Sequence, residues 1–253
     1  MRLTILGSGT VVPSATRKSS GYFLELADTS VMLDCGAGSV HSLAQYDLPW
    51  QRMSHLFVSH FHADHIGELA SVLTAFRVGM SVERSEPLLM VGPNGLDRVI
   101  EGLKVAFGKK LLESRFPINI QMLEAGQAVE LGRESKLMVA KTPHTPESLA
   151  VRIESGGRSI CYTGDTAFSE ELARFFHKAD VLVSECSYLQ PREGIRHLSV
   201  SESARMAAIA EVSKLVVTHF YFDVDEPRLK HELQHKYSGE VIVARDGMSV
   251  EIE

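Results

Sequence analysis

Residues 60–65 read His-Phe-His-Ala-Asp-His and stand between a strand-like run and a helix-like run. A strand that ends in a loop can aim alternate side chains at one point, so His60 and His62 can chelate one ion. Asp64 and His65 can then reach a second ion nearby. Imidazole and carboxylate ligands together suit zinc and similar dications. Because four ligand-type residues fall within six positions, the stretch predicts a two-ion metal site in preference to a solvated polar loop.

Three further ligand-type residues each follow a strand-like run elsewhere in the chain. His144 lies in Thr-Pro-His-Thr-Pro, Asp165 in Tyr-Thr-Gly-Asp-Thr and His219 in Val-Val-Thr-His-Phe. Taken singly each is weak evidence, because an Asp after Gly is usually a turn residue. Together they occupy the same kind of position, a strand end, as the cluster at 60–65. They are therefore the candidates for the remaining ligands of the site.

Strand-like and helix-like runs alternate along the chain, which predicts an α/β fold. Short β-branched or aromatic runs bounded by turn residues indicate strands at Leu3–Leu6, Tyr22–Leu26, Val31–Leu33, Leu56–Ser59, Leu88–Val91, Leu137–Ala140, Leu149–Ile153, Ile160–Tyr162, Val181–Val183, Leu215–Val217, Val241–Val243 and Ser249–Ile252. Apolar residues at helical spacing indicate helices at 66–76, 96–107, 169–178 and 200–210. Ser199 with Glu202 is a capping-box signature for the last of these. No linker or repeat interrupts the pattern, so we expect one domain over residues 1–253, with stacked sheets and helices outside.

The composition excludes several classes of protein. Apolar residues make up 44% of the 253 residues and charged residues 23%, which is ordinary for a globular protein. The formal net charge of -6 argues against the broad phosphate-binding surface of a nucleic-acid-binding protein. Cys35, Cys161 and Cys186 give no disulfide framework, which indicates a reducing compartment. Neither a secretory leader pattern nor an apolar run near the ~18 residues of a membrane span is seen. We therefore expect a cytoplasmic protein with no membrane partner.

The sequence resembles the metallo-β-lactamase superfamily over nearly its whole length. The matching blocks, in order, are Leu-Gly-Ser-Gly-Thr at 6–10, Leu-Asp-Cys-Gly-Ala-Gly at 33–38, the cluster at 60–65, and the regions of His144, Asp165 and His219. The resemblance implies an α/β fold of the four-layer αββα metallo-β-lactamase sandwich type. It also implies a site at one edge of the sandwich, between the two sheets.

The same resemblance implies a role for each ligand. The implied ligands of the first ion are His60, His62 and His144, and those of the second ion are Asp64, His65 and His219. Asp165 would bridge both ions. Asp34 would support the ligand loops, although a plain turn Asp is an equal alternative on sequence alone.

Within the superfamily the sequence is most similar to the ribonuclease Z branch. The similarity is carried by Ser-His-Phe-His-Ala-Asp-His-Ile-Gly-Glu-Leu at 59–69 and by the segments 7–20, 197–204, 216–220 and 244–248. Ser-Glu-Cys-Ser-Tyr at 184–188 stands where that branch carries a catalytic Glu. The resemblance implies that Glu185 and His197 form an acid pair near the metals. Without it, a strand-end carboxylate and a helix-flanking His would be the simpler interpretation.

Three departures from the branch argue against tRNA 3′ processing. The stretch between Gly92 and His144 has no Gly/Pro-rich insertion of the kind that forms a tRNA-clamping arm. No Arg follows Asp165 closely, and Lys18 stands where the branch usually has Asn. None of these differences touches the metal ligands.

The ligand set and the acid pair favour phosphodiester hydrolysis, with an RNA 3′ end (cut as by an endonuclease), a cyclic nucleotide or another small diester as substrate. Asp64 would orient or deprotonate the nucleophile, and His197, held by Glu185, would protonate the leaving alkoxide. The alternative on the same fold is hydrolysis of a carboxylic ester, thioester or lactone, and a non-catalytic metal-binding scaffold is the third interpretation. Two divalent ions, zinc or else manganese or iron, are the expected cofactors. A homodimer is what the resemblance suggests.

Overall fold

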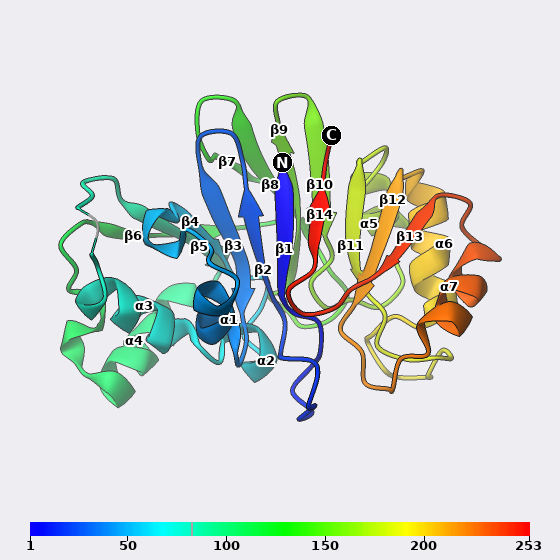
Figure 1. Ribbon diagram of the computed structural model, residues 1–253, viewed down its shortest axis with the longest axis horizontal. Helices are drawn as coiled ribbons and strands as arrows, with labels where there is room; N and C mark the ends of the chain where they lie inside the picture. Colours follow the sequence, from blue (N-terminus) through cyan, green and yellow to red (C-terminus); the bar gives the residue numbers. More distant parts are fainter. Residues whose placement is uncertain (82) are drawn as a thin grey trace.

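The computed structural model describes residues 1–81 and 83–253, and it contains two sheets that face each other. The strands of the first sheet, in spatial order, are β14 (Ser249–Glu251), β1 (Arg2–Gly7), β2 (Gly21–Glu25), β3 (Ser30–Cys35), β4 (His55–Phe57), β5 (Leu88–Pro93) and β6 (Ile118–Leu123). The strands from β14 to β3 are antiparallel, and those from β3 to β6 are parallel. The last strand of the chain therefore returns to pair with the first, which places the two termini close together (Figure 1).

The second sheet repeats this design. Its strands, in spatial order, are β13 (Glu240–Val243), β12 (Lys214–Thr218), β11 (Val181–Glu185), β10 (Arg158–Tyr162), β9 (Leu149–Ser155), β8 (Ser135–Lys141) and β7 (Ala128–Glu130). The strands from β7 to β10 are antiparallel, and those from β10 to β13 are parallel. Each parallel half is joined through helices, as parallel strands require.

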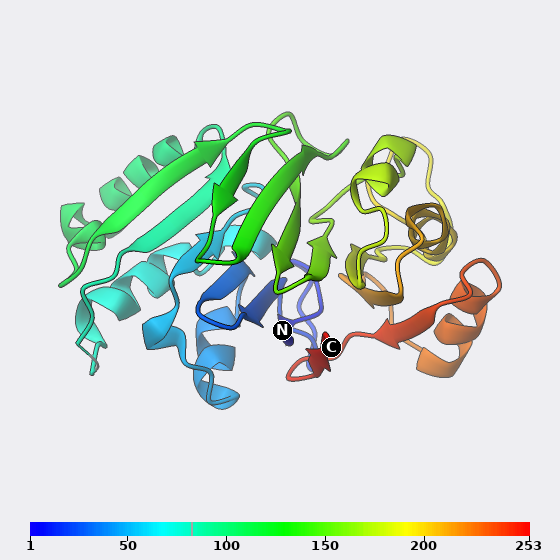
Figure 2. The same ribbon diagram turned by 90° about the horizontal axis from the view of Figure 1, so that it is seen from above.

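Helices cover the outer face of each sheet (Figures 1 and 2). Those of the first half are α1 (Ser39–Gln45), α2 (Ala63–Ile66), α3 (Leu69–Val78) and α4 (Leu96–Phe107), with the 3-10 turns η1 (Trp50–Arg52) and η2 (Lys109–Leu112). Those of the second half are α5 (Glu170–Phe175), α6 (Val200–Ala210) and α7 (Glu226–Gln234). Ser199 and Glu202 form the reciprocal capping box that the sequence predicts for α6.

Three buried apolar clusters separate the four layers. The middle cluster lies between the sheets, where Tyr22 of β2 and Tyr162 of β10 meet with ring centroids 4.9 Å apart. A second cluster joins the first sheet to α3 and α4 through residues such as Leu56 and Phe76. A third joins the second sheet to α5, α6 and α7. The predicted four-layer αββα architecture is therefore confirmed.

Several local predictions are wrong or incomplete. The helix predicted over 66–76 is two helices, since α2 ends at Ile66 and α3 begins at Leu69. Strands β6 and β7 and helices α1 and α7 have no counterpart in the predicted elements. Helix α7 was missed because it is mostly polar and buries only Leu229 and Leu233.

The strand ends that carry the candidate ligands open to one edge of the sandwich. Strands β4, β8, β10 and β12 run directly into the segments that hold the seven residues. The loop after β1 projects beyond the sheets at the lower end of Figure 1. No helix among residues 1–81 and 83–253 is long and apolar enough to cross a bilayer.

Candidate metal centre

The first group of candidate ligands comes from two sheets. His60 and His62 follow β4 of the first sheet, and His144 follows β8 of the second. The Nε2 atom of His144 lies 3.2 Å from Nδ1 of His62, and ligand atoms of all three lie within 4.8 Å of each other and of a carboxylate oxygen of Asp165. His62 is exposed whereas His60 is fully buried, so this group reaches from the interior to the surface.

The second group lies beside the first. Asp64 and His65 belong to α2, and His219 follows β12. The Nε2 atom of His219 lies 3.3 Å from Oδ2 of Asp64. His219 has a φ of 62°, a left-handed conformation that is uncommon outside glycine. Such strain persists only where the surroundings hold it, and it is often found at functional sites.

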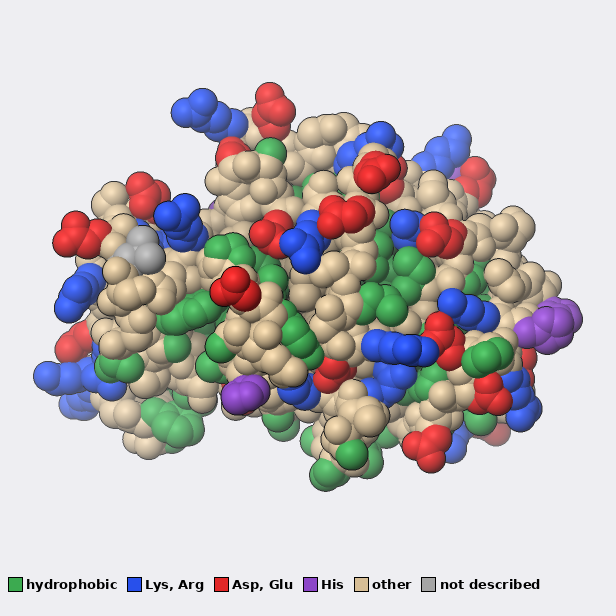
Figure 3. All heavy atoms as spheres, in the orientation of Figure 1, with side chains coloured by type: hydrophobic (Ala, Val, Ile, Leu, Met, Phe, Trp, Pro, Cys, Tyr) green, Lys and Arg blue, Asp and Glu red, His purple; other side chains and the backbone are tan. Residues whose placement is uncertain are grey.

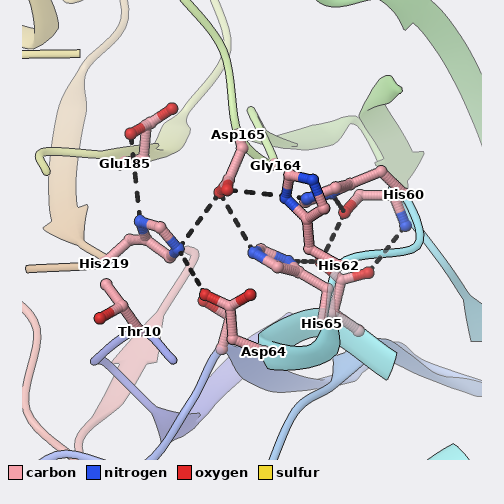
Figure 4. Close-up of polar contacts among 12 residues, drawn as sticks. Thr10, His60, His62, Asp64, His65, Gly164, Asp165, Glu185 and His219 are labelled. Atoms are coloured by element: carbon pink, nitrogen blue, oxygen red, sulfur yellow. Dashed lines mark hydrogen bonds and ion pairs between the residues drawn. The ribbon is translucent and has the colours of Figure 1, made fainter. Parts of the chain in front are cut away.

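Asp165 lies between the two groups and turns a different oxygen to each (Figure 4). Its Oδ1 atom is 3.2 Å from Nε2 of His65 and 3.3 Å from Nε2 of His219. Its Oδ2 atom is 3.6 Å from Nε2 of His60 and 3.7 Å from Nε2 of His144. A carboxylate in this position could bridge two ions.

The donor atoms fit two dications. A tetrahedral ion with bonds of about 2.1 Å separates its ligands by about 3.4 Å, close to the distances around Asp165. Among the described residues, the buried atoms without a hydrogen-bond partner include Nε2 of His60, Nε2 of His65 and Oδ1 of Asp165. Unpartnered buried polar atoms are unfavourable in a folded protein. Their convergence on one point is what a metal-binding site requires.

Hydrogen bonds set the tautomer of four histidines in the same way. The Nδ1 atoms of these rings face acceptors: Ser59 Oγ at 3.0 Å for His60, Asp34 Oδ2 at 2.7 Å for His65, the Arg196 carbonyl at 2.8 Å for His144 and Ser187 Oγ at 2.9 Å for His219. An imidazole that donates through Nδ1–H presents its lone pair at Nε2. All four Nε2 atoms face Asp165, so the rings are prepared to bind a cation there.

The electrostatics agree with this arrangement. Burial lowers the pKa of His60 and of His144, which favours the neutral imidazole that a metal ion needs. Burial alone would raise the pKa of Asp165, but its interactions with the His219 and His65 rings outweigh burial and hold that pKa well below its ordinary value. A carboxylate that stays ionised inside a ring of imidazoles is a strong ligand for a dication.

Asp34 supports the ligand loops from behind. It is fully buried and accepts four hydrogen bonds of 2.7 Å, from His65 Nδ1, the Tyr162 hydroxyl, and both the backbone N–H and the hydroxyl of Ser59. A β-carbon on Gly36 would lie 2.0 Å from the carbonyl oxygen of Asp64, so only glycine allows this close approach. The end of β3, with Asp34, and Gly36 just after it therefore fix the second ligand group.

Glu185 and His197 meet at the edge of the same centre. His197 Nδ1 lies 3.0 Å from Glu185 Oε2 and 3.8 Å from Asp165 Oδ2. Ser187 donates a hydrogen bond to Glu185 and accepts one from His219. Burial raises the pKa of Glu185. Burial alone would lower the pKa of His197. The hydrogen bond with Glu185 and the negative charge of that residue outweigh burial, so the pKa of His197 is raised above its ordinary value. The predicted pair is thus in contact.

Three site residues were missed from the sequence: Tyr162, Ser187 and Arg196. Tyr162 lies on a buried strand, and nothing in its sequence surroundings separates it from an ordinary core tyrosine. Arg196 donates to the carbonyl of His144 at 2.9 Å, across 52 positions of sequence. The one sequence signal for Arg196 is that it directly precedes the candidate acid His197. The roles of the seven candidate metal ligands and of the acid pair, nine residues in all, remain a prediction, which metal analysis tests for the ligands and activity measurements test for the pair.

Comparison with known proteins gives one family and several similar proteins. The family model described as anti-Pycsar protein Apyc1 matches residues 1–234. The probable metallo-hydrolase YhfI of Bacillus subtilis is 28% identical over 250 residues, covering 98% of both chains. A ribonuclease Z of Mycobacterium bovis is 28% identical over 276 residues, covering 100% of this chain and 98% of its own. The crystal structure of YhfI, a metallo-β-lactamase fold protein, superposes with a TM-score of 0.84 at 26% identity and covers 99% of each chain.

Proposed function

Because this chain belongs to the family described as anti-Pycsar protein Apyc1, within the ribonuclease Z-like branch of the metallo-β-lactamase superfamily, we propose that it is a dinuclear-metal phosphodiesterase. The predicted superfamily and branch are confirmed by the relatives, and the chain is a metal-dependent hydrolase. Its proposed substrates are an RNA 3′ end or a small or cyclic phosphodiester. Zinc is the proposed metal, with manganese or iron as the alternatives.

The position of Asp165 is the observation that carries the proposal. Its two oxygens face two separate histidine groups at 3.2–3.7 Å, so His60, His62 and His144 would hold one ion and Asp64, His65 and His219 the other. Two dications in such a site supply Lewis acidity toward a phosphoryl group and a water of lowered pKa.

The acid pair supports a diester with a poor leaving group. His197 uses Nδ1 toward Glu185, which leaves Nε2 free to donate a proton to the departing alkoxide. Glu185 holds the imidazolium in place. The carboxylate of Asp64, beside His219, would orient or deprotonate the nucleophile. An acyl substrate with a good leaving group has less need of such an acid, so the pair favours phosphodiester hydrolysis over ester hydrolysis.

The shape of the chain supports a short substrate. Between β5 and His144 the structure has α4, η2, β6, β7 and β8, with short connections, and residues 93–143 form no protruding arm (Figure 2). The net charge of -6 gives little long-range attraction for a polyanion. A single nucleotide or the very end of an RNA suits this surface better than a long contact with folded RNA.

The test is hydrolysis of bis-p-nitrophenyl phosphate by metal-analysed protein, with p-nitrophenyl acetate in parallel. We expect diester turnover that exceeds ester turnover and is lost in Asp165→Ala. Asp97→Ala, which changes an exposed carboxylate in the first turn of α4, serves as the matched control and should behave as wild type. Turnover of the ester alone would instead assign the chain to carboxylic ester, thioester or lactone hydrolysis.

A further inference from the structure

We propose that a cleft beside the metal centre binds a planar aromatic ring of the substrate, such as a nucleobase, against Tyr221. This inference rests on the proposed phosphodiesterase function and names a residue that selects among diesters. The cleft lies between the loop after β1 and the segment after β12, which run side by side at the lower edge of Figure 1. Its volume is about 790 Å³, in the range of small-molecule sites.

Tyr221 connects the cleft with the metal centre. It lines the cleft, and its ring centroid lies 5.6 Å from that of the candidate ligand His219 and 5.9 Å from that of the candidate acid His197. The ring is half-buried, so part of it remains open to a ligand. A phosphodiester at the metal centre would therefore place its own substituent next to Tyr221.

Tyr221 is also held in one orientation. Its ring stacks on Tyr188 with a centroid separation of 5.5 Å and an interplanar angle of 14°. The guanidinium of Arg192 lies 4.0 Å from the ring centroid of Tyr188, on a loop that also carries His197. Tyr188 thus contacts both Tyr221 and Arg192, and these contacts order the Tyr221 ring beside the reacting group before any substrate arrives. A surface that is already ordered loses little entropy on binding.

The lining of the cleft suits a flat ring with a polar edge. Phe220, Phe222 and Val12 supply apolar surface, and Ser14 and Asp223 supply hydrogen-bonding groups. The cleft is also lined by a cation, Arg17, whose guanidinium already has partners within the protein. Its guanidinium lies over the Phe220 ring at 4.7 Å and donates to Ser8 Oγ and the Ala244 carbonyl.

The mouth of the cleft carries exposed apolar side chains. Val11 and Val12, at the tip of the loop after β1, are 56% and 52% exposed, and apolar atoms are seen at this lower tip in Figure 3. They lie on the same loop as the cleft residues Ser14 and Thr16. The apolar surface thus continues outward from the cleft, where it can cover the second face of a bound ring.

Two diesters with the same leaving group test the inference. Thymidine 5′-(p-nitrophenyl phosphate) carries a base, and methyl p-nitrophenyl phosphate does not. Base stacking on one aromatic ring is expected to raise kcat/KM for the first substrate about 10- to 100-fold. Tyr221→Ala should bring the ratio of kcat/KM for the two substrates close to 1, whereas Tyr221→Phe should keep the wild-type ratio because the ring remains.

Leu189→Ala, at an exposed position next to Tyr188, is the control and should change neither substrate. Metal content is measured for every variant. An equal loss on both substrates, or no loss on the thymidine substrate, would overturn the inference. Binding of thymidine monophosphate and of methyl phosphate by calorimetry adds a readout that needs no turnover. If wild type hydrolyses neither diester, the proposed function fails. The base subsite is then tested by binding alone: it is supported if Tyr221→Ala weakens binding of thymidine monophosphate but not of methyl phosphate, and it is contradicted otherwise.

Discussion

The carboxylate of Asp34 holds the imidazole of His65 through a hydrogen bond of 2.7 Å between Oδ2 and Nδ1, and both side chains are fully buried. This contact leaves His65 Nε2 facing Asp165 without a hydrogen-bond partner. A residue 31 positions away therefore decides which nitrogen of a candidate ligand is available to a metal ion.

Asp34→Asn should weaken metal binding without unfolding the protein. An amide keeps one acceptor oxygen but loses the charge that orients His65, and loss of such a supporting group typically lowers metal affinity about 10- to 100-fold. Asparagine tolerates the left-handed backbone of residue 34, where φ is 56°. Competition with a chromophoric chelator measures the affinity.

Asp47→Asn is the matched control for this change, because Asp47 has a φ of 51° and is exposed. It should bind metal as wild type does. Equal affinity of Asp34→Asn and wild type would show that Asp34 does not support the site.

His197→Ala should affect substrates according to their leaving group. A general acid contributes about 10²–10⁴-fold where the leaving alkoxide is poor. We therefore expect a loss of that size on a dinucleoside monophosphate and a much smaller loss on bis-p-nitrophenyl phosphate, whose leaving group needs no proton. His177→Ala, at an exposed histidine just after α5 that belongs to none of the candidate ligand groups, is the control. The same loss on both substrates would exclude the acid role.

Gly164→Ala should disturb the bridging Asp165 more than a glycine change elsewhere. Gly164 has a φ of 56°, and an added β-carbon would lie 3.0 Å from Cβ of Ser59, which holds His60. Gly157 has a similar φ of 77°, but its β-carbon would meet nothing within 4 Å. Both substitutions should lower the free energy of unfolding by about 1–2 kcal/mol through backbone strain. Only Gly164→Ala should also lower metal content, and unchanged metal content would contradict the tight packing argued for this turn.

His55 should make folding stability depend on pH. Burial lowers its pKa in the folded protein to about 4, against an ordinary value near 6.5. The unfolded chain therefore binds the proton first as pH falls, and stability is lost between about pH 6.5 and pH 4. Linkage gives a loss of about 2 kcal/mol between pH 7.5 and pH 5.

Urea unfolding of wild type and His55→Gln at these two pH values measures this effect. The difference between the two proteins isolates His55, because the other histidines titrate in both. If both proteins lose the same stability on acidification, the burial of His55 does not act in this way.

The sequence indicates most of the site because its ligands occupy one kind of position. The cluster at 60–65 is local, and His144, Asp165 and His219 each follow a strand, so the pattern makes all of them candidates for one site, and the family resemblance places that site at one edge of the sandwich. The αββα arrangement follows from the alternation of strands and helices together with the family resemblance. The pattern cannot identify the residues that form hydrogen bonds with each candidate ligand.

Those partners are residues of ordinary type that contact the site only in three dimensions. Tyr162, Ser187 and Arg196 bond to candidate site residues through a hydroxyl or a backbone carbonyl, and no spacing rule marks such contacts. The break between α2 and α3 was missed for a related reason. The apolar period runs on through 66–76, while the short helix α2 is set by its contact with β3 rather than by its own pattern.

The number of metal ions per chain tests the central claim most directly. Wild type, saturated with zinc and then desalted, should contain two ions per chain by mass spectrometric metal analysis, as Asp165 facing two histidine groups requires. His62→Ala should lose one ion, and Asp165→Ala should lose at least one. A single ion in wild type, or two ions retained in Asp165→Ala, would contradict the two-ion centre.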